Sequence, residues 1–157
     1  MLQFSKRKTP KNIFVIFLLS SMIASFYIYF HYSEILAHRL LRRLIYRVIQ
    51  AEVLSRTRDV PFIITFNNRS YSLKFYNQII DKWEEFKSDF LPSCLSFNPL
   101  ITNFELVLSK GRLVEIRSVE HQNLSLRYLI VEILDEKTKK NLAKIVFYKN
   151  GKWKVLK

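Results

Sequence analysis

The amino-acid sequence predicts an α+β protein that one helix anchors in a membrane. Residues 13–30 form an uninterrupted apolar run without a charge, a proline or a glycine. Helical periodicity follows over residues 31–58 and appears again over residues 75–90. The C-terminal part consists of short strand-like segments separated by turn residues. These observations predict an N-terminal transmembrane helix, a juxtamembrane amphipathic helix, and then one helix packed on a curved antiparallel β-meander.

The apolar run has the length of a membrane span. A helix over residues 13–30 would be roughly 27 Å long, close to the roughly 30 Å hydrocarbon thickness of a bilayer. A cleaved signal peptide is the first alternative, but its apolar region is shorter and ends in small residues. This run ends in bulky aromatics that suit a membrane–water interface, including Phe26, Tyr27 and Tyr29. We therefore expect a basic tail at residues 1–12 and a transmembrane helix at residues 13–30, with a buried helix of a soluble core as the remaining alternative.

The second segment, residues 31–58, is predicted to be an amphipathic helix beside the membrane. Leu36, Leu40, Leu44 and Val48 fall on one apolar face. That face needs a cover, which could be lipid, the chain's own sheet or another subunit. Four arginines of this segment are predicted to lie at the membrane surface, facing anionic lipid headgroups: Arg39, Arg42, Arg43 and Arg47.

The formal net charge of +13 is concentrated beside the apolar run. Residues 1–12 carry four basic residues and no acid, while residues 31–58 carry six arginines and two glutamates. Because both flanks are basic, the positive-inside comparison gives nearly a tie. We expect the shorter, acid-free N-terminal flank to face the cytoplasm or matrix, in the inner membrane of a bacterium or a mitochondrion.

Residues 59–157 are predicted to form one small α+β domain. Pro61 ends the preceding helix, and PFIITF and SYSLKF then form a hairpin around Asn67, Asn68 and Arg69. Residues 75–90 are predicted to be an amphipathic helix, because Phe75, Ile79, Trp83, Phe86 and Phe90 recur at spacings of three and four. The following SCLSFNPL is predicted to be a loop.

The chain after Asn103 is predicted to be a meander of about five antiparallel strands. FELVLS and RLVEIRSV meet at Ser109-Lys110-Gly111, and DEKTKKN forms a charged, exposed turn. AKIVFYK and KWKVLK flank Asn150-Gly151, the pair favoured in two-residue type I′ hairpins. The aromatic face of the predicted helix at residues 75–90 would cover this sheet.

Apolar residues at successive positions of the last strands indicate that both sheet faces are covered. Leu129-Ile130-Val131 and Ile145-Val146-Phe147 lack the alternation expected of a sheet with one face in water. The second cover would be the helix at residues 31–56 folding back or a partner protein, of which we favour the partner. The aromatic residues predicted to face that partner are Tyr128, Phe147, Tyr148 and Trp153.

The sequence contains no recognisable active site, so we predict no enzymatic activity and no cofactor. Its only glycines, Gly111 and Gly151, fall in turns, which excludes a glycine-rich phosphate loop. His31, Glu34 and His38 share a helix face, but we interpret them as interfacial polar residues and predict no metal site. The single cysteine, Cys94, excludes an intrachain disulfide.

The last hairpin carries Gly151-Lys152-Trp153-Lys154-Val155. A helix on a curved meander that closes on such a strand resembles the nuclear-transport-factor-like and cystatin-like domains. The whole arrangement of tail, span, helix and domain resembles the single-span inner-membrane assembly factors of bacterial type IV secretion systems. It also resembles mitochondrial inner-membrane tethers of protein import and respiratory-chain assembly. The predicted hairpin ahead of the main helix departs from the helix-first order of these domains.

The predicted function is that of a non-enzymatic, single-pass subunit or assembly scaffold of a larger inner-membrane complex. Its domain would contact other subunits, and its basic helix would contact the bilayer. One alternative is a membrane-tethered domain that holds a lipid or hydrophobic ligand in a cavity beneath the helix at residues 75–90. Another is a contact to ribosome or nucleic acid, which we consider unlikely because no recognition motif is present. It would use seven lysines: Lys137, Lys139, Lys140, Lys144, Lys149, Lys152 and Lys154.

Overall fold

The computed structural model describes residues 11–120 and 125–156. Helix α1 (Lys11–Thr57) is followed by nine strands within these ranges, and a short 3₁₀ helix, η1 (Pro99–Asn103), precedes β5. The strands are β1 (Phe62–Asn67), β2 (Ser70–Asn77), β3 (Lys82–Phe90), β4 (Leu95–Phe97), β5 (Phe104–Ser109), β6 (Arg112–Ser118), β7 (Tyr128–Asp135), β8 (Asn141–Tyr148) and β9 (Trp153–Leu156). The chain divides into two compact units between Tyr32 and Ser33, so the C-terminal part of α1 belongs to the same unit as the strands.

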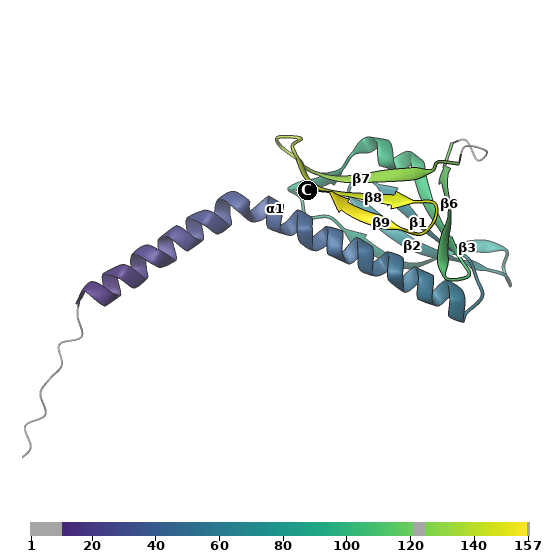
Figure 1. Ribbon diagram of the computed structural model, residues 1–157, viewed down its shortest axis with the longest axis horizontal. Coiled ribbons are helices and arrows are strands. Elements are labelled where there is room, and N and C mark those ends of the chain that lie inside the picture. Colours follow the sequence, from purple (N-terminus) through teal and green to yellow (C-terminus); the bar gives the residue numbers. More distant parts are fainter. Residues whose placement is uncertain (1–10, 121–124, 157) are drawn as a thin grey trace, which may run out of the picture. The chain divides into compact units, whose positions relative to one another are not determined.

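The strands form two antiparallel sheets, which confirms the α+β class. Strand order is β3-β2-β1-β5-β6 in the five-stranded sheet and β4-β7-β8-β9 in the four-stranded sheet (Figure 1). The single meander of about five strands that the sequence predicted is therefore too simple. The predicted loop after Pro92 contains β4, which pairs with the end of β7 through Leu95 and Asp135.

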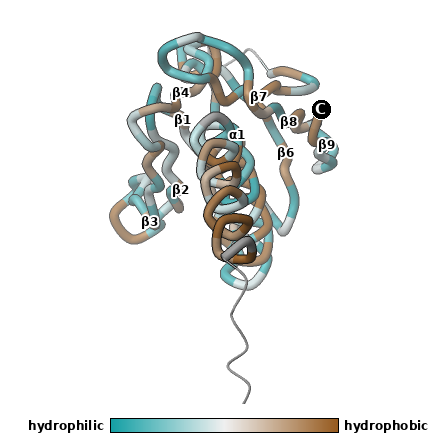
Figure 2. The backbone as a smooth tube through the Cα atoms, turned by 90° about the vertical axis from the view of Figure 1, so that its left-hand side faces the viewer, coloured by the Kyte–Doolittle hydropathy of each residue, from teal (hydrophilic) through white to brown (hydrophobic). Residues whose placement is uncertain are grey.

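Helix α1 provides the centre of the core in the second unit. Six of its apolar side chains are 4% exposed or less: Ala37, Leu40, Leu41, Leu44, Val48 and Ala51. They share one cluster with side chains of both sheets, such as Phe62 of β1 and Ile145 of β8. Figure 2 shows β1–β3 on one side of the helix and β6–β9 on the other. The cover that the apolar face of this helix required is thus the chain's own sheets.

The helix predicted at residues 75–90 is wrong, because this segment is the end of β2, a turn and β3. The two strands pair from Ser70 with Phe90 to Asn77 with Lys82, with a register shift between Leu73 and Lys74 that leaves Phe86 without a paired residue in the ladder. Asp81 adopts a positive φ of 54° in the turn, a conformation that Asp tolerates better than most residues. The expected apolar face does not form, since Ile79 is 94% exposed and Phe90 is 74% exposed. The alternative function of a ligand cavity beneath a helix at residues 75–90 is therefore not supported, because the helix that would cover the cavity is absent from this segment.

The turn residues in the sequence predict the positions of the β1–β2 and β8–β9 hairpins correctly, but they predict the wrong turn type for one of them. The β1–β2 hairpin turns at Asn68-Arg69, as predicted. At the β8–β9 hairpin only Gly151 has a positive φ, of 81°, whereas a type I′ turn requires two such residues. The Gly151 N–H donates to the Tyr148 carbonyl at 2.9 Å, so the connection is a longer loop closed by a left-handed glycine.

The C-terminal end of α1 is fixed to the β5–β6 turn. The backbone N–H of Gly111 donates to the Ser55 hydroxyl at 2.9 Å, and Ser55 is fully buried. Gly111 has a φ of 77°, and a Cβ at this position would lie 2.5 Å from Nε of Arg56. Only glycine meets both requirements, the left-handed backbone and the close approach of the helix.

Candidate interaction surface

The first unit presents an apolar helix surface. Every large hydrophobic side chain from Ile13 to Tyr29 is between 47% and 79% exposed. The coils of this part of α1 are predominantly hydrophobic in Figure 2. An apolar surface of this extent on a folded chain marks a region that lipid or another protein covers.

The polar groups within the apolar run are satisfied locally. The hydroxyls of Ser20, Ser21 and Ser25 donate to the carbonyls of Phe17, Leu18 and Ser21 at 2.8–2.9 Å. These bonds satisfy the three serine hydroxyls without water, as an apolar environment demands.

No single helix in the described ranges is both long and apolar enough to cross a membrane. The segments Ile13–Tyr29 and His31–Thr57 meet the length and hydropathy criteria only as a bent pair. The transmembrane helix expected at residues 13–30 thus stays a prediction.

The predicted membrane-surface arginines have two different environments. Arg39, Arg42 and Arg43 are exposed on α1. Arg47 instead pairs with Asp89 of β3, with Nε 2.7 Å from Oδ2, and the two side chains are only 12% and 16% exposed. A second guanidinium nitrogen donates to Gln50 at 2.9 Å. Arg47 therefore joins the helix to the edge strand of the five-stranded sheet.

The ion pair affects the pKa of Asp89 itself and of the nearby Tyr71. The hydrogen bond from Arg47, together with its charge, holds the pKa of the Asp89 carboxyl below its usual range. Tyr71, whose hydroxyl is buried nearby, has a raised pKa, mainly because burial disfavours the phenolate and also because Asp89 is negatively charged. Both residues thus keep their ordinary neutral-pH protonation states, and the pair acts as a fixed charged contact.

We expect the Asp89 contact to stabilise the fold at neutral pH and not in acid. The folded pKa of Asp89 is depressed, so its contribution is complete above the unfolded pKa of about 3.9 and is lost as pH falls through the folded value. Asp89→Asn should lower the free energy of unfolding by about 1–2 kcal/mol at pH 7, and this difference should be smaller near pH 3, below the unfolded pKa of about 3.9. Urea unfolding of both proteins at the two pH values measures it. Glu85→Gln, at an exposed position of the same strand, is the control, and a pH-independent loss in Asp89→Asn would contradict the assignment.

A basic hollow lies beside this ion pair. Its volume is about 400 Å³, and it is lined by Arg42, Arg43, Tyr46, Arg47, Lys87 and Asp89. Four cations against one carboxylate give the hollow an excess of positive charge. Lys87 and Asp89 of β3 could not be assigned to this site from the sequence, because the segment was predicted to be a helix packed elsewhere.

An exposed helix stripe continues from the hollow along α1. Tyr46, Ile49 and Val53 are 63%, 43% and 55% exposed and recur at helical spacing. Ile49 and Val53 also border a smaller hollow of about 180 Å³ next to Gly111. The outer face of this helix is therefore apolar in its middle and basic at the hollow. The helical spacing of Tyr46, Ile49 and Val53 is visible in the sequence. The sequence also shows a longer apolar face on the same helix, the one that packs against the sheets, and that face determined the prediction.

The four aromatic residues predicted to face a partner occupy two environments. Tyr128, Tyr148 and Trp153 are 54%, 38% and 40% exposed, and the rings of Tyr128 and Tyr148 lie 6.5 Å apart on neighbouring strands. Phe147 is only 1% exposed and belongs to the core. Alternation along β8 explains the difference, because Phe147 points to the opposite face from Tyr148. Phe147 is therefore not available as a surface contact.

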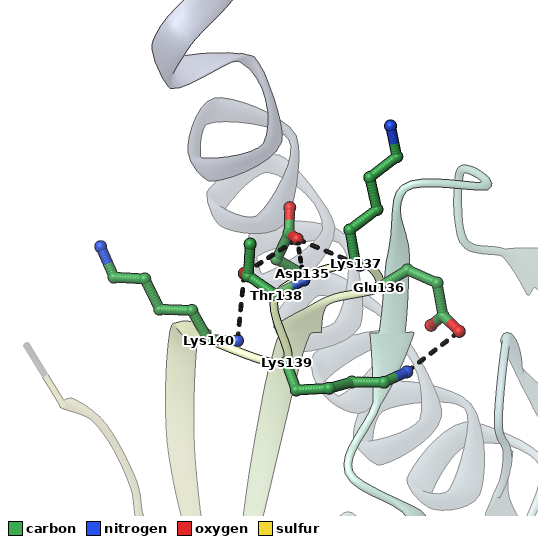
Figure 3. Close-up of polar contacts among 6 residues, drawn as sticks. All are labelled: Asp135, Glu136, Lys137, Thr138, Lys139 and Lys140. Atoms are coloured by element: carbon green, nitrogen blue, oxygen red, sulfur yellow. Dashed lines mark hydrogen bonds and ion pairs between the residues drawn. The ribbon is translucent and has the colours of Figure 1, made fainter.

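The lysines proposed for nucleic-acid contact are partly neutralised. Lys144 pairs with Glu132 at 2.8 Å and Lys139 with Glu136 at 3.0 Å. Figure 3 shows the β7–β8 turn, in which the Asp135 carboxylate accepts hydrogen bonds from the backbone and hydroxyl of Thr138 at 2.8 and 2.9 Å. The turn is charged and exposed, as predicted, and the nucleic-acid hypothesis stays a prediction.

The described residues do not form a metal-binding site. Among them, no group of three or more His, Cys, Asp or Glu side chains is placed to hold an ion. Glu34 and His38 line a hollow of about 600 Å³ beside β8, together with Asn141 and Lys144.

Comparison with known proteins shows the fold. No protein-family model and no curated protein sequence matches this chain. Two solved structures of the minor pseudopilin EpsH from the type 2 secretion system of Vibrio cholerae are similar to it. One has a TM-score of 0.55 at 11% identity and covers 76% of this chain and 95% of its own. The other, a crystal structure, has a TM-score of 0.57 at 10% identity and covers 78% and 94%.

This similarity shows a pseudopilin-like fold, and it does not show what the chain does. These neighbours are not nuclear-transport-factor-like or cystatin-like proteins, and that resemblance stays a prediction.

Proposed function

We propose that this chain is a non-enzymatic, membrane-anchored subunit of a larger protein complex in a bacterial inner membrane. The observation that carries the proposal is the dual use of α1. Residues 33–57 build the core of the β-rich unit, and Ile13 to Tyr29 expose apolar side chains whose interspersed hydroxyls are satisfied within the helix. The same stretch of chain would thus supply both the core of a folded domain and an apolar anchor.

The pseudopilin-like fold supports the same proposal. The similar structures are described as minor pseudopilins of a secretion system, which by name are components of a larger assembly. We extend to this chain only the class of role, a subunit that works through protein contacts. The bacterial source of these neighbours leads us to choose a bacterial membrane over a mitochondrial one, with the N-terminal tail on the cytoplasmic side.

The first test is membrane retention and native mass. The tagged full-length protein should stay with the membrane through an alkaline carbonate wash. After extraction in a mild detergent and a 0.5 M salt wash, it should be recovered in a particle far larger than the 18.9 kDa chain.

The matched control carries Leu18→Asp and Ile23→Asp in the apolar run. Each charge costs about 2.5–3.5 kcal/mol at the centre of a span, so we expect this variant to be released by carbonate. A wild-type chain that carbonate releases, or that elutes as a bare monomer, would refute the proposal.

A further inference from the structure

Three cations of the basic hollow form no ion pair with any residue that the structure describes. Among the described residues, Arg47 is the only cation lining the hollow with an ion-pair partner, and that partner is Asp89. Arg42 and Arg43 project from α1, and Lys87 projects from β3 two residues before Asp89. Arg42, Arg43 and Lys87 are exposed, so their mutual repulsion is weak in water, but an anion between them would gain from all three charges at once. The hollow is therefore suited to binding a negatively charged group.

The surroundings of the hollow indicate what carries that group. Tyr46 belongs both to the lining of the hollow and to the exposed helix stripe with Ile49 and Val53. An isolated phosphate would use the cations but leave the stripe uncovered. A protein segment with an acidic side chain beside apolar ones would use both, since buried apolar contacts next to charged groups are typical of protein interfaces.

The charge of the chain argues against a second copy as the occupant. Its formal net charge is +13, so two copies repel each other at this surface. The guanidinium groups of Arg42 and Arg43 match the bidentate geometry of a carboxylate. A different, acidic protein fits both observations.

We propose that the basic hollow and the exposed helix stripe together form a docking site for an acidic amphipathic segment of another subunit. A carboxylate of that segment lies between Arg42, Arg43 and Lys87, and its apolar side chains cover Tyr46, Ile49 and Val53. This inference deepens the proposed function and rests on it, because it specifies the chemistry of one partner in the complex.

The test places a photo-crosslinker at the site in the full-length protein. Tyr46 is replaced by p-benzoylphenylalanine, the intact cells are irradiated, and the attached peptide is identified by mass spectrometry. We expect a peptide of another protein with Asp or Glu within one helical turn of apolar residues. Adding Arg42→Glu and Arg43→Glu should lower the yield of this product at least tenfold.

Two comparisons make the result specific. A matched control carries Arg39→Glu, which changes the charge of an exposed arginine on the same helix outside the hollow, and it should retain the crosslink. Replacing the acidic residue of the identified partner with Lys should restore the crosslink of the Arg43→Glu variant.

Other outcomes overturn the inference. They are a crosslink to lipid, a crosslink to a second copy, a peptide without acidic residues, and an equal loss with Arg39→Glu. The native mass of the wild-type protein separates the two proposals. A large wild-type particle that gives no crosslink to another protein refutes this docking site alone, whereas a bare wild-type monomer refutes the proposed function as well.

Discussion

Leu44→Ala should destabilise the β-rich unit by about 3 kcal/mol, within the range of about 2–5 kcal/mol measured for buried leucines. Leu44 lies on α1, is 1% exposed, and belongs to one cluster with side chains of both sheets. Removing its side chain leaves a cavity that neither the helix nor the flanking sheets can fill without distortion. The free energy of unfolding of the full-length protein in detergent, from urea denaturation, measures the effect.

The control for this prediction is Ile49→Ala on the outer face of the same helix. Ile49 is 43% exposed, so its truncation should change stability by less than about 1 kcal/mol. The pair also separates two arrangements of the helix. If residues 31–58 lay on the bilayer apart from the domain, Leu44→Ala would leave the strands as stable as before. Equal effects of the two changes would contradict the packing described here.

The parts of the fold that could be predicted from sequence are those determined locally. The apolar run, the helix after it and the hairpin turns at Asn68-Arg69 and Gly111 each depend on residues close together in the chain. Their periodicity and turn residues carry the information needed. The charged turn at residues 135–140 belongs to the same class.

The hairpin of β2 and β3 could not be predicted, because apolar residues of the two strands recur at a spacing that also fits a helix. Phe75, Ile79 and Trp83 have helical spacing, but Trp83 lies opposite Tyr76, with ring centroids 5.4 Å apart. An edge strand with much of its surface in water needs little hydrophobic alternation, so β3 lacks the usual signal. The Arg47–Asp89 contact was missed for the same reason, because Asp89 was expected on a different helix.

From the sequence we favoured a partner protein over the helix as the second cover of the sheets, whereas in the structure the helix packs against both sheets. Ala37 and Ala51 are fully buried, which lets the helix approach the strands closely. Small residues on a helix face do not reveal which surface they meet. The contribution of a partner is therefore restricted to surfaces outside this core, such as the outer face of α1 and the exposed aromatics of the four-stranded sheet.

Phe147→Ala should have the largest effect among the four aromatic residues first assigned to a partner interface. Phe147 is 1% exposed and packs within the core cluster, so its truncation should cost about 3–5 kcal/mol in unfolding free energy. Tyr148→Ala is the matched control, because Tyr148 is the next residue of β8 and is 38% exposed on the opposite face. Its loss removes mainly the cross-strand contact with Tyr128 and should cost about 0.2–1 kcal/mol.

Two readouts distinguish a core residue from an interface residue. Urea unfolding should shift strongly for Phe147→Ala and little for Tyr148→Ala, while the native particle mass reports the contacts to other subunits. If Tyr128, Tyr148 and Trp153 face a partner, alanine at these positions should reduce the native mass without changing unfolding of the isolated chain. A folded Phe147→Ala variant of unchanged stability that fails to enter the particle would place Phe147 at the interface and would contradict its burial in the core.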